Sequence, residues 1–215
     1  MDVRLQNIIS WLREQTIPSG GLLVPVSGGT DSALCLFLCA EAYPGLVRGV
    51  YAGTALRERA WFGRVAPIYL VRQPVVADVE DEIIRWAKFL AMSNRDKRAL
   101  VGTRNRTEDV FGTYSLASRV ATILPLVGLW KSEIMGLAAS VGIPEAILVS
   151  STRADPDCGR PVELAEISLD RIDLFLQVTC GEREPHELSI LSDSEQAYLT
   201  DIYQGNAFKA NLPFR

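Results

Sequence analysis

The segment Ser27-Gly28-Gly29-Thr30-Asp31-Ser32 constrains this chain more than any other. It follows a continuous apolar run of strand length, Leu22–Val26, and it leads into an apolar run of helical length, Ser32–Tyr43. A tight turn between a buried strand and a helix aims several backbone N–H groups and the positive end of the helix dipole at one spot. The segment therefore predicts an anion-binding site at the end of a strand.

The side chains of this turn favour a phosphate that carries a bound cation. Its two glycines let the backbone approach a phosphate closely, and its Ser and Thr hydroxyls add hydrogen-bond donors. Asp31 would repel a phosphate unless it also held Mg²⁺. The alternative is a glycine turn in which Asp31 or Ser32 caps the helix. The chain has no G-x-x-x-x-G-K-[ST] motif, so it lacks the lysine of P-loop kinases and GTPases.

The first half of the chain alternates strand and helix patterns. We expect further strands at Leu46–Tyr51, Ile68–Val71 and Ala99–Val101, and helices at Val3–Leu12, Ala55–Phe62 and Ala77–Met92. Alternation of this kind predicts an α/β fold, a doubly wound parallel sheet with helices on both faces. Pro25 has no N–H, so we expect a missing ladder bond or a bulge there.

The second half has mainly helical patterns. We expect helices at Lys131–Val141, from a cap at Ser168 to about Gln177, and from Ser192 or Ser194 to Tyr203. The polar segment Ser150–Pro161 reads as a surface loop, because the core pattern resumes a few residues later. Residues 1–215 are therefore expected to form a single domain.

Composition excludes several classes of function. The 22 Lys and Arg residues against 26 Asp and Glu residues give a net charge of −4, so a nucleic-acid partner is not expected. The four cysteines form no C-x-x-C pair and there is one histidine, which argues against structural zinc. No span reaches about 18 uninterrupted apolar residues, so no membrane association is expected. We expect a reduced, cytoplasmic protein in which Cys35 and Cys39 act as small core residues.

Several motifs, in order, resemble one enzyme family. The segment Ser27–Ser32 matches the SGGxDS loop of the ATP pyrophosphatases, the PP-loop family, which split ATP to AMP and pyrophosphate. The segment Val101–Glu108 is similar to the GTGNRSE stretch of the ammonia-dependent NAD⁺ synthetases within that family. The likeness continues at Leu124–Lys131, Gly142–Glu145 and Ile167–Asp173, and it returns at Phe208-Lys209. It covers nearly the whole chain.

The resemblance implies an almost complete ATP site. Asp31 and Glu108 would ligate Mg²⁺, and Asp31 and Lys131 are the candidates for a direct part in the chemistry. A Thr or Ser that the family places against ATP falls on Arg153, with Thr152 one position away. The bland interpretation is a solvated Glu108 and a Lys131 that only serves the first turn of its helix. The candidate ATP-binding residues are Ser27, Gly28, Gly29, Thr30, Asp31, Ser32, Thr103, Lys131, Thr152 and Arg153.

The side that would bind the second substrate departs from the family. Arg85 matches a family arginine, but a second arginine expected two residues earlier is replaced by Ile83. A lysine and an aspartate expected in the region Leu116–Ile123 are both absent. The terminal His-Lys of the family is Phe208-Lys209 here, which leaves Arg85 and Lys209 as second-substrate candidates. Arg119 and Arg153 could replace some of the missing charges.

The activity that the resemblance implies is an AMP-forming amide ligase acting on nicotinic acid adenine dinucleotide, ATP, Mg²⁺ and ammonia. Its relatives are homodimers, so a homodimer is expected. No residues remain for a glutamine-hydrolysing domain, so ammonia is free or comes from a separate glutaminase. One alternative is sulfur transfer, with Cys158 as the candidate thiol. Another is a catalytically retired paralogue that binds ATP and a partner, although both metal carboxylates are present.

Overall fold

A parallel sheet with the strand order β3-β2-β1-β4 forms the centre of the computed structural model, which describes residues 1–53, 55–71, 79–150 and 162–210. Each neighbouring pair of strands is parallel. The strands are β1 (Leu22–Pro25), β2 (Val47–Ala52), β3 (Ile68–Val71) and β4 (Ala99–Leu100). The predicted doubly wound α/β fold is confirmed.

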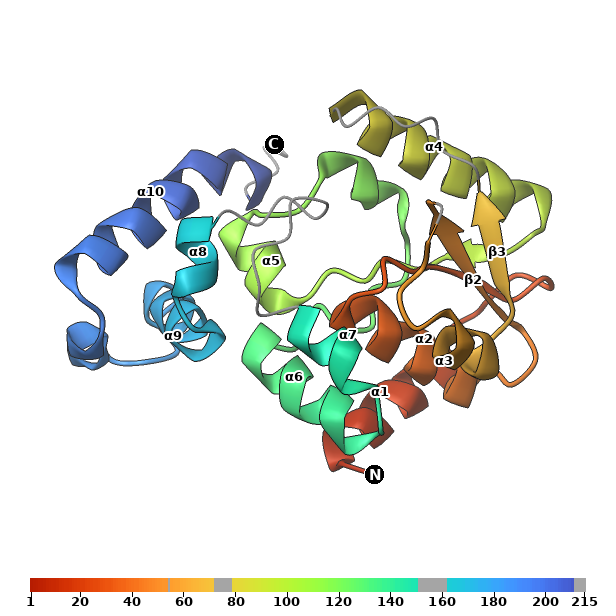
Figure 1. Cartoon of the computed structure of the whole chain (residues 1–215), viewed down its shortest axis with the longest axis horizontal. Helices are drawn as coiled ribbons and strands as arrows, with labels where there is room; N and C mark the ends of the chain where they lie inside the picture. The colour runs from red at the N-terminus through yellow and green to blue at the C-terminus, as the bar shows by residue number, and fades with distance from the viewer. Residues whose placement is uncertain (54, 72–78, 151–161, 211–215) are drawn as a thin grey trace.

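Helices connect and surround the strands (Figure 1). In the N-terminal half they are α1 (Val3–Glu14), α2 (Thr30–Ala42), α3 (Arg59–Val65) and α4 (Val79–Arg95). In the C-terminal half they are α5 (Arg106–Phe111), α6 (Lys131–Ser140), α7 (Glu145–Ser150), α8 (Val162–Glu166), α9 (Leu169–Thr179) and α10 (Asp193–Ala210). Two 3-10 helices, η1 (Leu116–Val120) and η2 (Pro185–Ile190), complete the described elements.

The two faces of the sheet bury different side chains of the same strand. Leu22 and Val24 pack into the large core with α1 and α2, whereas Leu23 packs into a smaller core with Phe89 of α4. This division follows from the alternation of side chains along a strand. In Figure 1, α4 lies on one side of the sheet, and α2 and α3 lie on the other. Burial on both faces explains why the strand reads as a continuous apolar run.

Pro25 sits where its missing N–H costs nothing. The N–H groups of Leu22 and Val26 donate to Leu46 and Val50 on the β2 side, so residue 25 faces the β4 side. Pairing of β1 with β4 ends at Leu23 opposite Leu100, before residue 25. The ladder therefore ends there, which accounts for the expected missing bond.

A second core holds the C-terminal helices against α5 and α6. It contains Phe111 of α5, Trp130 before α6, Phe175 and Leu176 of α9, and Leu199 of α10. The α8, α9 and α10 group lies beside the sheet rather than over it (Figure 1). Helix α6, whose Ile134, Leu137 and Ala138 belong to the large core, therefore lies between the two hydrophobic cores.

Most sequence-predicted elements are present, with shifted ends. The helix expected at Ala55–Phe62 spans Arg59–Val65, and the helix expected from Ser32 begins at Thr30. The two predicted N-cap residues have different outcomes. Ser168 precedes α9 but makes no side-chain capping hydrogen bond, whereas the Ser192 hydroxyl accepts from the Glu195 N–H at 3.3 Å. The expected loop 150–161 lies almost entirely outside the described residues. Across the described ranges, no helix is both long and apolar enough to cross a bilayer.

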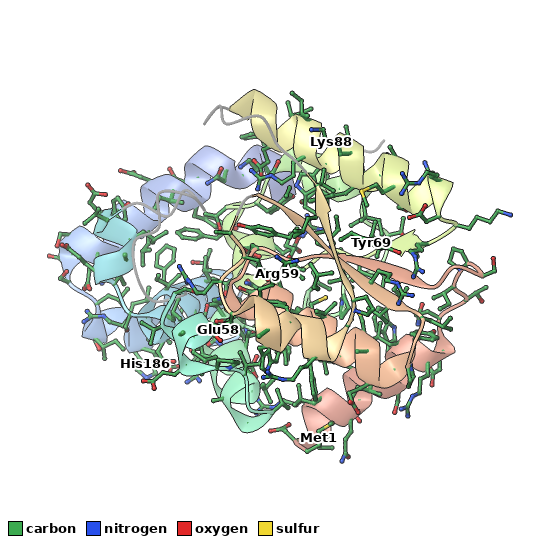
Figure 2. The ribbon with its side chains drawn as sticks, turned by 45° about the vertical axis from the view of Figure 1, so that its right-hand side comes forward. Met1, Glu58, Arg59, Tyr69, Lys88 and His186 are labelled. Carbon is green, nitrogen blue, oxygen red and sulfur yellow. The ribbon has the colours of Figure 1, made fainter. Side chains whose placement is uncertain are left out.

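Figure 2 shows Tyr69, an exposed residue of the edge strand β3. Cys35 and Cys39 are fully buried free thiols, as predicted, and Cys180 is an exposed free thiol. The hydrogen bond with Cys39, and then burial, raise the pKa of the Cys35 thiol well above its usual value. The buried pair therefore behaves as core filling at neutral pH.

Candidate functional site

The predicted anion loop forms at the carboxyl end of β1. Gly28 has φ +85°, in the left-handed region that favours glycine. The loop is fastened by Ser32, whose hydroxyl donates to the Gly29 carbonyl at 3.0 Å and accepts the Ser27 N–H at 3.1 Å. Helix α2 then begins at Thr30, with Gly29 as the preceding residue. The loop thus presents a glycine backbone and the N-terminus of a 13-residue helix to one side.

Thr30 differs from the other residues of the loop because its side chain is fully buried. Its hydroxyl donates to the Ile147 carbonyl of α7 at 3.3 Å. In this structure the hydroxyl therefore ties two helices together.

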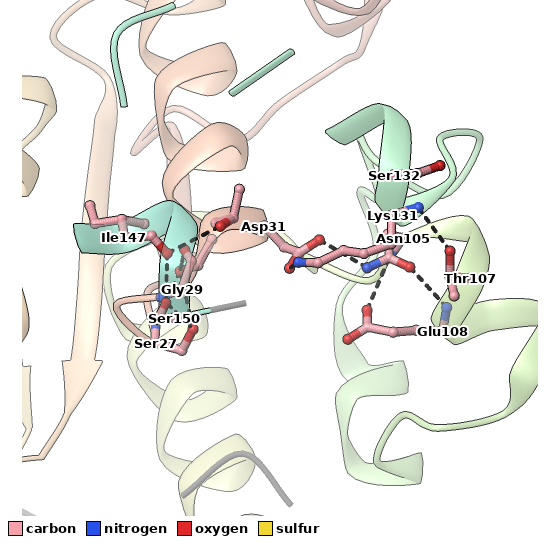
Figure 3. Close-up of polar contacts among 12 residues, drawn as sticks. Ser27, Gly29, Asp31, Asn105, Thr107, Glu108, Lys131, Ser132, Ile147 and Ser150 are labelled. Carbon is pink, nitrogen blue, oxygen red and sulfur yellow. Dashed lines mark hydrogen bonds and ion pairs between the residues drawn. The ribbon is translucent and has the colours of Figure 1, made fainter. Parts of the chain in front are cut away.

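Asp31 is the meeting point of three segments that lie far apart in the sequence (Figure 3). Its Oδ1 accepts a hydrogen bond from the Asn105 side-chain amide at 2.9 Å, and its Oδ2 forms an ion pair with Lys131 Nζ. Lys131 is the first residue of α6, and its side chain is 11% exposed. Asn105 precedes α5 and is almost fully buried. The contacts join α2, α5 and α6 at the carboxyl ends of β1 and β4.

Strand order explains why the site lies at this place. The chain moves outward from β1 to β2 and β3, and then returns to add β4 on the other side of β1. Loops that leave two such strands diverge and open a crevice at their carboxyl ends, where α/β proteins bind ligands. Thr103, a predicted ATP contact, follows β4 at this edge and is partly exposed. Among the described residues, the crevice therefore combines the Ser27–Ser32 loop with the segment after β4.

Glu108 is held by a capping box at the start of α5. Asn105 Oδ1 accepts from the Glu108 N–H at 2.8 Å, and Glu108 Oε2 accepts from the Asn105 N–H at 3.1 Å. Burial, and then the nearby Asp31 carboxylate, raise the pKa of Glu108 to about 7, against the opposing effect of Lys131. Asn105 therefore links the two predicted metal carboxylates, with one contact to each.

These residues fit a divalent cation. Asp31 and Glu108 form a pair of carboxylates, and the charges that oppose them are the Lys131 ammonium group and, more weakly at Glu108, the Arg104 guanidinium. Among the described residues, no group of three or more His, Cys, Asp or Glu side chains gathers as a metal site. Mg²⁺ is commonly bound by one or two carboxylates together with substrate phosphates. The donor set therefore suits a cation that arrives with a phosphate ligand.

A cluster of cations lies around Tyr114 on the side expected for the second substrate. The Arg104 guanidinium lies 4.1 Å from the Tyr114 ring centroid, and the Arg119 guanidinium lies at 5.5 Å. Lys209 Nζ lies 5.9 Å from the same centroid and donates to the carbonyls of Gly112 and Tyr114. Arg119 donates to the Tyr114 hydroxyl at 2.6 Å and to the Lys209 carbonyl. The structure therefore brings Lys209 together with Arg119.

Arg85, the other second-substrate candidate, is not part of this cluster. It lies on α4, and no ion pair of its side chain is found within the described ranges. Of the apolar residues at the positions where the family resemblance implies charges, Ile83 is 57% and Leu116 46% exposed, whereas Ile123 is buried. Thr152, Arg153 and Cys158 lie outside the described residues, so the structure gives no placement for them.

Sequence reasoning did not select Asn105, Thr107 or Asp173 as site residues, although all three lie in the motifs quoted above. The signal for Asn105 is its spacing, because an Asn three residues before a Glu is the pattern of a capping box. Thr107 and Asp173 form a buried hydrogen bond between α5 and α9 that no local pattern predicts. Their significance depends on contacts made across 66 residues.

The sequence matches a family model described as NAD synthase over residues 75–213. Among curated relatives, an NH₃-dependent NAD⁺ synthetase from Carboxydothermus hydrogenoformans is 26% identical over 181 residues, which cover 70% of this chain and 74% of that protein. An enzyme of the same description from Methanosarcina mazei is 26% identical over 210 residues, covering 83% and 82% of the two chains.

Two solved structures share the fold. The NH₃-dependent NAD synthetase of Campylobacter jejuni, in complex with nitrate, has a TM-score of 0.75 at 21% identity and covers 100% of this chain and 99% of its own. An NMN synthetase from Francisella tularensis has a TM-score of 0.75 at 18% identity and covers 99% and 96%. At these identities the likeness concerns the fold alone.

Proposed function

The chain belongs to the NAD synthase family, and from that premise we propose that it is an ATP-dependent amide ligase that converts nicotinic acid adenine dinucleotide to NAD⁺. The observation that carries the proposal is the meeting of Asp31, Asn105 and Lys131 beside the glycine loop, with Glu108 next to them. These residues combine an anion loop, a paired carboxylate and an ammonium at the crevice of a doubly wound sheet.

The reaction has two steps. A carboxylate oxygen of the acid attacks the α-phosphorus of ATP, and the bond from that phosphorus to the oxygen bridging to the β-phosphorus breaks, releasing pyrophosphate. Ammonia then attacks the carbonyl carbon of the acyl-adenylate, the bond to AMP breaks, and the nitrogen loses a proton. The products are the amide, AMP and pyrophosphate. No side-chain nucleophile is needed, so positioning and charge stabilisation are the contribution of the protein.

Each part of the site has a task in this scheme. The Ser27–Ser32 loop binds the pyrophosphate portion of ATP through backbone N–H groups, and Lys131 offsets the negative charge of the phosphates. Asp31 and Glu108 would hold Mg²⁺, which when bound would stabilise the negative charge of the phosphates during transfer of the adenylyl group. Thr103 contacts ATP from the end of β4. The ion pair between Asp31 and Lys131 must open in part when a cation binds, because both then compete for Asp31.

The acid binds on the Tyr114 side. Arg119 and Lys209 supply positive charge there, and they take over from the charges absent at Ile83 and Leu116. Each hydrogen bond to a charged group contributes about 1.5–3 kcal/mol, and micromolar affinity corresponds to about 8 kcal/mol in total. Two missing contacts are therefore enough to change which carboxylate is preferred. Arg85 contributes from α4 only if the acid reaches across from the Tyr114 cluster.

The test is AMP and pyrophosphate formation from MgATP and ammonium, with nicotinic acid adenine dinucleotide as the acceptor. Nicotinic acid mononucleotide and simple carboxylates form the comparison panel. We expect AMP only when an acceptor is present, and NAD⁺ in equal amount with the dinucleotide. A preference for the mononucleotide would retain the ligase chemistry and change the substrate. Absence of AMP with every acceptor would reject the activity and leave an ATP-binding paralogue.

Asp31→Asn is the informative variant for this assay, and Asp193→Asn is its matched control. Both residues are aspartates in the first turn of a helix, but Asp193 is exposed on α10 and distant in sequence from the loop. We expect Asp31→Asn to remove AMP formation and Asp193→Asn to retain it. An equal loss in both variants would contradict a specific role for Asp31.

Assembly and ammonia supply complete the proposal. Exposed apolar side chains on neighbouring elements, Tyr69 and Leu70 of β3 and Ile83 and Ile84 of α4, support a homodimer. Sedimentation velocity tests this expectation. We propose that ammonia is free or is delivered by a separate glutaminase. Among the described residues, Cys35, Cys39 and Cys180 are free thiols, which supports a reducing, cytoplasmic location.

A further inference from the structure

The first turn of α6 receives its hydrogen-bond partners from two other helices. The first N–H groups of a helix have no partner within the helix and must find one elsewhere. The Lys131 N–H donates to Thr107 Oγ1 of α5 at 2.8 Å, and the Ser132 N–H donates to Asp173 Oδ2 of α9 at 2.7 Å. The start of α6, and with it the Lys131 backbone, is therefore fixed by α5 and α9.

Asp173 connects these contacts. Its side chain is buried, with the residue 2% exposed, and its Oδ1 accepts the Thr107 hydroxyl at 2.5 Å. One carboxylate thus holds Ser132 directly and holds Lys131 through Thr107. Lys131 in turn carries the ammonium group that pairs with Asp31. A continuous chain of contacts runs from α9, in the second core, to the carboxylate beside the anion loop.

We propose that Asp173, acting through Thr107 and the first turn of α6, is the positioning residue that aims Lys131 at Asp31 and the phosphates. The Lys131 ammonium group, which binds ATP in the proposed function, is thereby supported from α9. The catalytic part of this inference rests on the proposed function. Asp173 itself touches neither Asp31 nor Lys131 Nζ among its described contacts.

The cost of the buried carboxylate supports a positioning role. Burial raises the pKa of Asp173, and the bonds from Thr107 and Ser132 act in the opposite direction. An ionised group in an apolar core is a poor source of stability, because its desolvation offsets the gain from pairing. Within the described ranges, the Thr107 hydroxyl and Ser132 donate to Asp173, and both residues help to hold the first turn of α6. The arrangement therefore places a buried carboxyl group where it orients a helix rather than where it would best fill a core.

A spectroscopic test follows Lys131 without any need for activity. The sequence contains four lysines, Lys88, Lys97, Lys131 and Lys209, so their ε-methylene resonances are resolvable in ¹³C-lysine-labelled protein. Loss of one resonance in Lys131→Met assigns it. We expect Thr107→Val and Asp173→Asn to move the Lys131 resonance towards that of an unpaired lysine. Thr107→Ser retains the hydroxyl and should keep the wild-type position.

The control for this experiment is Asp170→Asn, the same change one turn earlier on α9 at an exposed position. It should leave the Lys131 resonance unmoved. A Lys131 resonance that is unchanged in Thr107→Val and Asp173→Asn, with the other lysines at their folded positions, would overturn the proposal. If Asp173→Asn unfolds, Thr107→Val decides, because it removes one hydroxyl and retains the shape of the side chain.

Kinetics separate positioning from general support of the fold. We expect Thr107→Val to lower kcat for pyrophosphate release by about 10- to 100-fold, as small misplacements of a reacting group do. In a Lys131→Met background the same substitution should change kcat by less than about twofold, because its target is gone. Equal losses in both backgrounds would overturn the proposal. If the wild type releases no pyrophosphate, the proposed function fails, and the Lys131 resonance still decides the positioning role.

Discussion

Replacing Glu108 by Gln should change how the stability of the ligand-free protein depends on pH. Ionisation of Glu108 lowers the stability of the folded protein, because burial and the adjacent Asp31 raise the pKa of this carboxyl to about 7 from the usual 4.5. A carboxyl whose folded pKa is raised adds stability that is fully present below pH 4.5 and is lost as the pH rises through 7. Gln retains an oxygen for the capping box and carries no charge.

The magnitude follows from the two pKa values. The difference between 4.5 and about 7, at 1.36 kcal/mol for each pKa unit, amounts to about 3 kcal/mol. Other groups, including the buried Asp173, also affect the pH dependence, but they are present in both proteins. The difference between wild type and Glu108→Gln therefore isolates Glu108. We expect Glu108→Gln to gain about 3 kcal/mol on the wild type between pH 4.5 and pH 8.

The assay is urea unfolding of both proteins at a series of pH values, with EDTA and without nucleotide. Glu133→Gln is the matched control, because Glu133 accepts the Trp130 N–H at 2.9 Å from the same position of α6 but is 34% exposed and pairs with Arg4. An exposed ion pair of that kind contributes about 0–1 kcal/mol. The reasoning is refuted if wild type and Glu108→Gln lose stability in parallel across this range, or if Glu133→Gln reproduces the effect.

Three further predictions concern the nucleotide, the acid and the loop. Removing Mg²⁺ with excess EDTA, or making Glu108→Ala, should lower the rate of pyrophosphate release by about 1,000-fold. A metal supplies several kcal/mol of transition-state stabilisation, and each 1.36 kcal/mol is tenfold in rate. Near wild-type turnover in either case contradicts the metal assignment. Arg119→Ala should raise KM for the dinucleotide about tenfold or more while KM for ATP stays constant, since it removes charged contacts beside Tyr114; steady-state kinetics with each substrate varied in turn measures both. Gly28→Ala should cost about 1–2 kcal/mol in thermal or urea unfolding, because φ +85° is strained for alanine, and a calorimetric titration should show weaker MgATP binding; unchanged stability argues against the loop geometry.

The sequence was sufficient to predict the strand, loop and helix that form the anion site. Continuous apolar runs such as Leu22–Val26 record burial on both faces, and the glycines of the loop record its backbone geometry. These are local signals, so they appear in the sequence in contiguous form. The helix expected at Ala55–Phe62 began later, at Arg59, because no strong capping signal marks its start and Glu58 there takes a left-handed conformation.

The parts that sequence reasoning missed are contacts between distant segments. Thr107 and Asp173 look like ordinary helix residues, and only the fold shows that they form a hydrogen bond at the start of α6. The role of Arg119 beside Lys209 likewise depends on α10 returning to the end of α5. The sequence shows which side chains are charged, but not which groups they contact, because those contacts depend on how the two cores pack.

The cap of α6 has a consequence for synthesis of the chain. The Ser132 N–H donates to the Asp173 carboxylate, which lies 41 residues further along the chain. The ribosome therefore makes Ser132 before its partner. At about 5–20 residues per second, the ribosome takes roughly 2–8 s to add the missing partner. During that interval the nascent chain has the glycine loop and Lys131 but not the buried carboxylate that fixes their relation. The large N-terminal core can assemble while the chain grows, whereas competence to bind nucleotide must wait until α9 has emerged and docked.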